Sequence, residues 1–218
     1  MVSFRRNPRP SVVIIGLGRF GMAVGEELVR SGVEVLGIDC SEAKVNEAAQ
    51  VLTYAAVADT NSPEALRQLS VHEAHRVVVA IGSDMGASLL CASNVVDFKV
   101  PSIWAKATSP SHAKILRQIG VHHVIRPEHD TGRRIAHLMN GRLQEYAEFD
   151  ADYAIVKVAP PVSLYGNQVR DIEQVQIIAI RPPGQTFRDA QPDDVLGAGS
   201  LILAAGAPAD LEAFGTMD

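Results

Sequence analysis

The chain has 218 residues, which suits one domain of about 140 residues and a smaller second one. Its 47% apolar and 21% charged residues are typical of a globular protein, and no apolar run approaches the roughly 20 residues that cross a bilayer. A net charge of −5, without a cluster of lysines and arginines, argues against nucleic-acid binding. Two cysteines, Cys40 and Cys91, are too few to staple such a fold, which favours a reducing cytoplasm.

Short β-branched runs alternate with helical patterns from Ser11 to about Ile125. This alternation predicts an α/β fold with a Rossmann-like, doubly wound parallel sheet, and the continuously apolar runs indicate that both faces of the sheet are covered. Ser62 and Ser109 each precede a proline, which predicts two helix starts with a capping hydroxyl. The expected strands are residues 12–15, 35–38, 53–57, 77–81, 102–105 and 124–125.

A last helix of this domain is expected from about Asp130 to Tyr146, because apolar residues recur there at spacings of three and four. This stripe packs either on its own domain or on another chain, and the sequence leaves both open. Its members are Ile135, Leu138, Met139, Leu143 and Tyr146. The composition then turns acidic at residues 148–152, which places a first domain at residues 11–149 and a second at residues 150–218.

The second domain is predicted to be a small α+β lobe. Strands are expected at residues 153–158, 175–180 and 200–205, separated by loops rich in proline and glycine, with a short helix at residues 167–172. A lobe of this size has a marginal core, which packing on a symmetry mate would stabilise.

A glycine-rich motif, Gly-Leu-Gly-Arg-Phe-Gly, occupies residues 16–21 between the first expected strand and a helical pattern. In a strand-turn-helix setting, Gly16 permits the tight turn, Gly18 lets a diphosphate approach the backbone and Gly21 allows close helix–strand contact. Free N–H groups at the helix start then bind the anion. Asp39 ends the second strand, 18 residues after Gly21, where a carboxylate accepts hydrogen bonds from ribose hydroxyls and repels a 2′-phosphate.

Packing is the alternative interpretation of these residues: the glycines only bring helix and strand together, and Asp39 only caps the next helix. Three glycines and an acid at the right distance favour nucleotide binding. Asp59 and Thr60 follow the third strand, and Ile81, Gly82 and Asp84 follow or end the fourth. Ligands of open α/β sheets gather at these carboxyl ends, although Asp59 and Asp84 also precede helices and suit capping.

With these residues in place, the chain resembles the cytoplasmic RCK (regulator of K⁺ conductance) proteins of the Ktr/Trk potassium-uptake systems, of the Ktr type, from residue 11 onward. The residues that carry the resemblance are the motif at 16–21, Asp39, Ala58–Thr60, Ala105–Ala107, Ile119–Gly120 and Arg126–Gly132. The resemblance implies a cytosolic regulatory subunit that binds ATP or ADP. It further implies that the subunit lies at the inner face of the cell membrane.

The resemblance also implies roles for particular residues. Arg19 is expected to reach the terminal phosphates, Lys106 to lie near them, and Glu128 to help a divalent cation, Mg²⁺ or Ca²⁺, bind at the γ-phosphate. A hard cation prefers carboxylate and phosphate oxygens, but an acid in the first turn of a helix is also favoured by the helix dipole alone. The further expected cofactor-binding residues are Phe20, Cys40, Asp59, Thr60, Ile81 and Gly82.

In relatives of this family the second lobe binds cyclic di-AMP at a two-fold interface. Here the corresponding residues are Ile177, Ile178, Ile180, Arg181 and Pro192. Isoleucines at strand spacing equally suit a core. The resemblance further implies a homodimer that assembles into an octameric ring under a membrane-embedded potassium-translocating subunit. A ligand changes the equilibrium between two shapes of such a ring only by its difference in affinity for the two shapes.

Two alternative functions use the same strand-turn-helix unit. A nicotinamide-dependent oxidoreductase needs an acid-base group, and the sequence shows no His-Asp relay, no Tyr-x-x-x-Lys pair and no cysteine with a positioned base. The seven histidines are interpreted as surface residues. The second alternative is a regulator of the Trk type that binds NAD or NADH. Trk-type relatives usually carry Gly-x-Gly-x-Val-Gly, whereas Arg19 and Phe20 here favour the extra phosphate charge of ATP and ADP.

Overall fold

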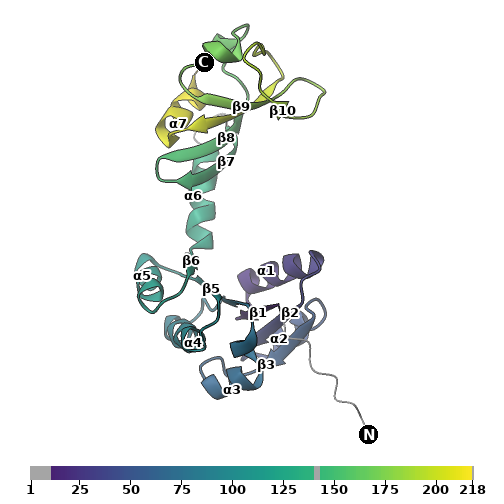
Figure 1. Cartoon of the computed structure of the whole chain (residues 1–218), viewed down its shortest axis with the longest axis vertical. Coiled ribbons are helices and arrows are strands. Elements are labelled where there is room, and N and C mark those ends of the chain that lie inside the picture. The colour runs from purple at the N-terminus through teal and green to yellow at the C-terminus, as the bar shows by residue number, and fades with distance from the viewer. Residues whose placement is uncertain (1–10, 140–142, 218) are drawn as a thin grey trace. The chain divides into compact units, whose positions relative to one another are not determined.

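The computed structural model describes residues 11–139 and 143–217, and the chain divides into two compact units after Pro127. The first unit is an α/β domain and the second is a smaller unit built on an antiparallel sheet (Figure 1). The predicted fold class, a doubly wound parallel sheet with a smaller lobe, is confirmed.

Within residues 11–127, six strands form one parallel sheet in the order β3-β2-β1-β4-β5-β6. Every pair of neighbours is parallel, and the order reverses at β1, so the chain winds outward in both directions from the centre. The strands are β1 (Val12–Ile15), β2 (Val35–Asp39), β3 (Tyr54–Val57), β4 (Arg76–Val79), β5 (Ser102–Lys106) and β6 (His123–Ile125). All six expected strands are therefore present, with ends that differ by at most two residues.

Helices bury the two faces of this sheet in two separate apolar clusters. On one face Val12, Ile14 and Val78 pack with residues of α1 and α2, and on the other Val13, Ile15 and Ile103 pack with residues of α3, α4 and α5. The helices are α1 (Arg19–Arg30), α2 (Glu42–Ala48), α3 (Pro63–Gln68), α4 (Met85–Asp97) and α5 (Pro110–Gln118), with a 3₁₀ turn at Val71–Glu73. The Ser62 and Ser109 hydroxyls accept hydrogen bonds from the third residue of α3 and α5, which confirms both predicted caps.

The second unit contains an antiparallel sheet of five strands within residues 143–217, in the order β10-β9-β11-β8-β7. Its strands are β7 (Leu143–Asp150), β8 (Tyr153–Val158), β9 (Gln176–Arg181), β10 (Arg188–Asp189) and β11 (Leu201–Gly206), flanked by α6 (Pro127–Met139) and α7 (Pro208–Thr216). Ile202, Leu211 and Phe214 are fully buried in its core. The expected helix at 167–172 is a 3₁₀ turn at Val169–Asp171, preceded by another at Val162–Leu164.

The expected helix from Asp130 to Tyr146 is wrong in its second half. α6 ends at Met139, and Leu143 and Tyr146 are buried residues of β7. The ladder between β7 and β8 shifts register between Leu143 and Glu145, so this segment carries one extra residue. Such a bulge lets two residues three positions apart face the same core, which imitates the spacing of a helix.

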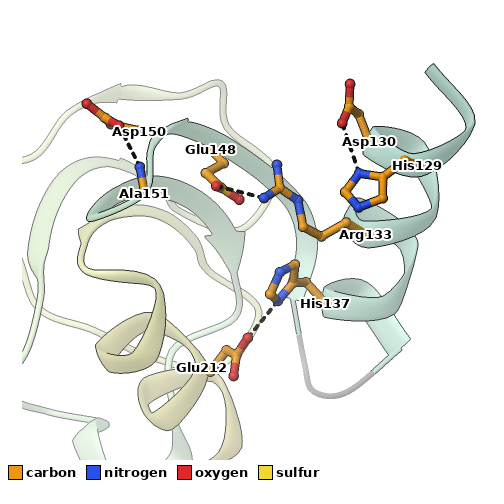
Figure 2. A network of polar contacts seen from close by, with 8 residues as sticks. All are labelled: His129, Asp130, Arg133, His137, Glu148, Asp150, Ala151 and Glu212. Atoms are coloured by element: carbon orange, nitrogen blue, oxygen red, sulfur yellow. Dashed lines mark hydrogen bonds and ion pairs between the residues drawn. The ribbon is translucent and has the colours of Figure 1, made fainter. Parts of the chain in front are cut away.

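Side chains of α6 bind the second unit (Figure 2). Arg133 donates to Glu148 of β7 at 3.0 Å, and Arg134 pairs with Glu145. The His137 ring lies 2.6 Å from Glu212 of α7 and stacks on Tyr146 with a centroid distance of 4.1 Å. By its contacts α6 therefore belongs with the smaller unit, whereas the sequence placed residues up to 149 in the first domain.

Among the described residues, no helix is both long enough and apolar enough to cross a membrane. Cys40 and Cys91 are both free. Cys91 is buried in α4, and burial raises the pKa of its thiol to about 12. Its thiol therefore stays protonated at neutral pH. Cys40 is exposed directly after β2.

Candidate functional site

The glycine motif forms the turn between β1 and α1, as expected. Gly16 has φ +100°, and a Cβ there would lie 2.9 Å from the Ala80 carbonyl carbon and the Ile81 nitrogen. A Cβ on Gly21 would collide with the Gly16 carbonyl oxygen. Both positions therefore require glycine because the backbone of the turn, β4 and α1 meet there.

Gly18 differs from the other two glycines, because a Cβ added there would meet no atom within 4 Å. Its φ of −81° is open to any residue, so the fold itself places no demand for glycine at this position. Gly18 is the N-cap of α1, whose first backbone N–H groups have no partner within the helix. The positive end of this 12-residue helix is thus suited to an anion that approaches closely over Gly18.

Asp39, at the end of β2, is only 4% exposed and is held by the backbone. The Leu17 N–H donates to Oδ2 at 2.8 Å, and the Ser41 N–H donates to Oδ1 at 2.9 Å. Lys44 of α2 places its Nζ 3.2 Å from Oδ2. The acid therefore ties the glycine turn to Ser41, the residue before α2, without capping the first turn of that helix. Its role as the ribose acceptor stays a prediction.

Two opposing effects act on the Asp39 carboxyl. Burial favours the neutral form, but hydrogen bonds from Ser41 and Leu17 and the charge of Lys44 outweigh it and hold the pKa below its usual value. The carboxylate is therefore ionised at neutral pH. The stability that it contributes is present above its usual pKa and is lost as the pH falls through the lowered one.

Lys106 and Phe20 lie beside the turn. The Lys106 ammonium is 5.7 Å from the centre of the Phe20 ring, and a Cβ on Gly82 would lie 3.6 Å from the Lys106 Nζ. Because Lys106 ends β5 and Ile81–Gly82 follow β4, these residues meet at the carboxyl edge of the sheet, near the start of α1. Arg19, the first residue of α1, is exposed. Two cationic residues, Arg19 and Lys106, therefore border the turn, which favours an anionic ligand.

The acids after β3 and β4 have local structural partners. Asp84 is the N-cap of α4 and accepts the Ala87 N–H at 3.0 Å, which confirms the capping interpretation. Asp59 accepts the Asn61 N–H at 2.9 Å within its own loop, while Ser62 caps α3. Thr60 is buried between them. Asp59 remains exposed, so its hydrogen bond within the loop leaves part of the carboxylate open.

Glu128 lies in the first turn of α6, within the second unit. Its assignment as a ligand of Mg²⁺ or Ca²⁺ stays a prediction. Among the described residues, no group of three or more His, Cys, Asp or Glu side chains is placed to hold a metal ion.

The residues predicted for cyclic di-AMP differ in burial. Ile177 and Ile180 are buried in the core of the second unit, whereas Ile178, at an irregularity in the ladder between β9 and β11, is 37% exposed. Arg181 is half-buried with its guanidinium 5.2 Å from the centre of the Phe187 ring. Pro192 is exposed, and its carbonyl accepts the Arg170 N–H at 3.1 Å. Ile177 and Ile180 thus fit the core interpretation. Binding of cyclic di-AMP by Ile178, Arg181 and Pro192 stays a prediction.

The expectation that the histidines lie on the surface is wrong for His112. This residue of α5 is fully buried, and its Nδ1 lies 3.3 Å from the Thr108 N–H. Burial lowers the pKa of its ring. The helix turns His112 toward the core because it lies three residues after the Ser109 cap and four before buried Leu116.

Sequence reasoning missed two groups at the candidate site, the Leu17 N–H and Lys44. A backbone N–H leaves no signal in a sequence. Lys44 lies five residues after Asp39 in an unremarkable helical pattern, so only the geometry of the β2–α2 loop brings its ammonium to the acid.

A glycine turn between strand and helix, facing an acid at the end of the next strand, defines a Rossmann-type domain. The family model of the TrkA-N domain matches residues 12–127. Ktr system potassium uptake protein C of Bacillus subtilis (strain 168) is 30% identical over 207 residues, 92% of this chain and 94% of the relative. Ktr system potassium uptake protein A of Vibrio alginolyticus is 33% identical over 199 residues, 88% of this chain and 90% of the relative. The chain therefore belongs to the TrkA-N family, and the resemblance to the RCK proteins of Ktr systems is confirmed.

Solved structures share the fold. The GsuK channel matches 98% of this chain and 40% of its own, with a TM-score of 0.71 and 16% identity. GsuK bound to NAD matches 95% of this chain and 39% of its own, with a TM-score of 0.64 and 16% identity. GsuK bound to ADP matches 58% of this chain and 34% of its own, with a TM-score of 0.50 and 15% identity. This chain spans less than half of these channel chains.

Proposed function

We propose that this chain is a cytoplasmic nucleotide-sensing subunit that regulates a membrane potassium transporter. The observation that carries the proposal is the ionised carboxylate of Asp39, fixed by the Leu17 N–H beside the exposed start of α1. This arrangement offers a ribose acceptor and an anion site on one rigid turn. The whole-length similarity to Ktr potassium uptake proteins supports potassium transport as the regulated process.

ATP and ADP are the proposed ligands. Lys106 beside Gly82 and exposed Arg19 at the first turn of α1 supply two positive charges near the turn, which suits a chain of phosphates. NAD or NADH is the second candidate, because the same fold binds both NAD and ADP in GsuK. The two candidates share the adenosine diphosphate half, so Asp39 and Gly18 serve either one.

The proposed switch is a change of shape that depends on the nucleotide. A ligand shifts an equilibrium between two shapes only by its difference in affinity for them. The γ-phosphate of ATP, with a Mg²⁺ or Ca²⁺ ion at Glu128, would supply that difference. Glu128, in the first turn of α6, and His137, which contacts Glu212 of α7 from the last turn, belong to the same helix of the smaller unit.

We further propose that the chain forms a homodimer and that dimers close into an octameric ring on a membrane-embedded potassium-translocating subunit. The outer face of α4 supports self-assembly: no charged residue lies between Asp84 and Asp97, and Met85 and Leu90 are 48% and 59% exposed. Large apolar side chains exposed on an uncharged stretch of a surface helix suit packing against a partner. The ring would lie at the inner face of the membrane.

Thermal unfolding of the full chain tests the ligand. We expect ATP and ADP to raise the unfolding temperature more than NAD⁺ or NADH, and Asp39→Ala to abolish the effect because the ribose loses its acceptor. Asp152→Ala, which removes an exposed acid from the loop between β7 and β8, is the matched control and should keep the full shift. A larger shift with NADH would replace ATP and ADP by the second candidate. No shift with any nucleotide would end the proposal.

Cyclic di-AMP is proposed as a second ligand, at exposed Ile178 and half-buried Arg181 of β9. Calorimetric titration of the full chain with cyclic di-AMP should release or absorb heat, and Arg181→Met should remove the signal because the guanidinium pairs with phosphate. A flat titration of the unaltered chain would show that cyclic di-AMP is not a ligand, and it would leave the proposal for the nucleotide site unchanged.

A further inference from the structure

The Asp39 carboxylate is surrounded by donors from its own chain. Oδ2 accepts the Leu17 N–H at 2.8 Å and lies 3.2 Å from the Lys44 Nζ. Oδ1 accepts the Ser41 N–H at 2.9 Å and lies 3.7 Å from the Cys40 sulfur. A carboxylate offers about four lone-pair positions, so these four contacts leave none for another donor.

The four donors differ in how readily they leave. The Leu17 and Ser41 N–H groups belong to the glycine turn and to the N-cap of α2, and breaking either would leave a backbone group without a partner. The Cys40 thiol is a weak donor at a long distance. Lys44 makes the remaining contact, and its side chain is 46% exposed, so its ammonium can turn into water without loss of hydration.

A ribose with two neighbouring hydroxyls needs two of these positions. The first hydroxyl can take the position on Oδ1 by displacing only the Cys40 thiol. The second hydroxyl needs the position on Oδ2 that the Lys44 ammonium occupies. The ribose hydroxyls and the Lys44 ammonium therefore compete for the same oxygen.

We propose that Lys44 is a specificity-determining residue of the nucleotide site: its ion pair with Asp39 must open before a ribose with free hydroxyls can bind. This inference rests on the proposed function. With the Ser41 and Leu17 N–H groups, Lys44 stabilises the ionised acid in the free protein. Its ion pair lowers the affinity for every ribonucleotide by the free energy of the pair. A ligand whose sugar lacks hydroxyls has no need to displace it.

Calorimetric titration of the full chain with ADP and with 2′,3′-dideoxy-ADP tests the competition. Lys44→Met keeps the length and apolar stem of the side chain and removes the ammonium, so we expect it to bind ADP about two- to fivefold more tightly than the unaltered chain. Its affinity for 2′,3′-dideoxy-ADP should not rise. Lys114→Met, which removes an exposed lysine of α5, controls for the loss of one positive charge and should leave ADP affinity unchanged.

The outcomes separate this inference from the proposed function. Unchanged or weaker binding of ADP by Lys44→Met would overturn the competition, and so would an equal gain for the dideoxy nucleotide. In either case the nucleotide site itself would stand. Failure of the unaltered chain to bind ADP would instead overturn ADP as the ligand and this inference with it. Full binding of ADP by Asp39→Ala would overturn the role of Asp39 on which both the proposed function and this inference rest.

Discussion

Gly18 and Gly21 differ in the space that a side chain would have at each position. A Cβ on Gly21 would collide with the backbone of Gly16, whereas a Cβ on Gly18 would meet nothing within 4 Å. The motif already predicts separate roles for the three glycines, with Gly18 as the one that a diphosphate approaches. The structure separates them into Gly16 and Gly21, which the fold requires, and Gly18, for which only close approach of a ligand would explain a missing side chain.

Gly18→Ala is therefore expected to separate binding from folding. The free energy of unfolding of this variant should lie within about 0.5 kcal/mol of that of the unaltered chain, because a Cβ at residue 18 meets no atom and the φ angle suits any residue. Its affinity for ADP should fall at least tenfold, because the added methyl group keeps the phosphates away from the N–H groups at the start of α1. Gly21→Ala should destabilise the chain by about 2 kcal/mol or more. Denaturant unfolding together with calorimetry checks both. Undiminished ADP binding by Gly18→Ala would place the phosphates elsewhere.

His112 gives the chain a dependence on pH that no residue pattern predicted. Its ring is fully buried and its pKa is lowered by burial, so the folded protein keeps it neutral. Below a pH of about 6.5 the His112 ring binds a proton in the unfolded chain but stays neutral in the folded chain. The free energy of unfolding should therefore fall as the pH falls from about 7 to about 5, by up to about 1.4 kcal/mol per pH unit.

His112→Asn should flatten this dependence, because asparagine offers the Thr108 N–H an acceptor but binds no proton. His75→Asn, at an exposed histidine, is the matched control and should keep the original slope. Denaturant unfolding at several pH values provides the comparison. Equal slopes for His112→Asn and the unaltered chain would assign the dependence to other groups.

The elements of the first unit were predictable because each of their signals is local. Apolar runs fix the strands, and Ser62 and Ser109 fix two helix starts by hydrogen bonds within three residues. β7 was not predictable in this way, since the bulge between Leu143 and Glu145 gives its buried residues a spacing of three. Only pairing with β8, which lies later in the chain, decides that this segment is a strand.

Leu143→Ala tests the strand assignment of β7. Leu143 is buried, and α7 approaches it so closely that a Cβ on Gly215 would lie 2.8 Å from its Cδ2. Truncation should therefore destabilise the second unit by about 2–5 kcal/mol. Gln144→Ala, the next residue of the same strand, is exposed and should change stability by less than about 0.5 kcal/mol. Similar small effects of both substitutions would contradict the buried position of Leu143.

At the scale of the whole molecule, the sequence predicted two domains but divided them differently from the contacts. The acidic stretch at residues 148–152 suggested a boundary, but it lies within and just after β7, and α6 is bound to the smaller unit by Arg133 and His137. A composition change marks a surface turn as readily as a domain boundary, and only contacts between distant residues distinguish the two.

The outer face of α4 leads to a prediction about assembly. If this face packs on a second copy, Leu90→Asp should lower the molecular mass of the assembly in solution, because an unpaired carboxylate buried at the interface is strongly unfavourable. Gln50→Asp adds the same charge at an exposed position after α2 and should leave the mass unchanged. Light scattering coupled to gel filtration measures both. An unchanged assembly in Leu90→Asp would assign self-association to another surface.

As a nucleotide-sensing subunit, this protein is proposed to change shape according to the nucleotide bound at the glycine turn. Small-angle X-ray scattering of the full chain saturated with ATP and Mg²⁺, and again with ADP, tests it most directly. We expect two distinct scattering curves for the unaltered protein and a single shared curve for Asp39→Ala under the same conditions. Identical curves for the unaltered protein with ATP and with ADP would contradict the claim.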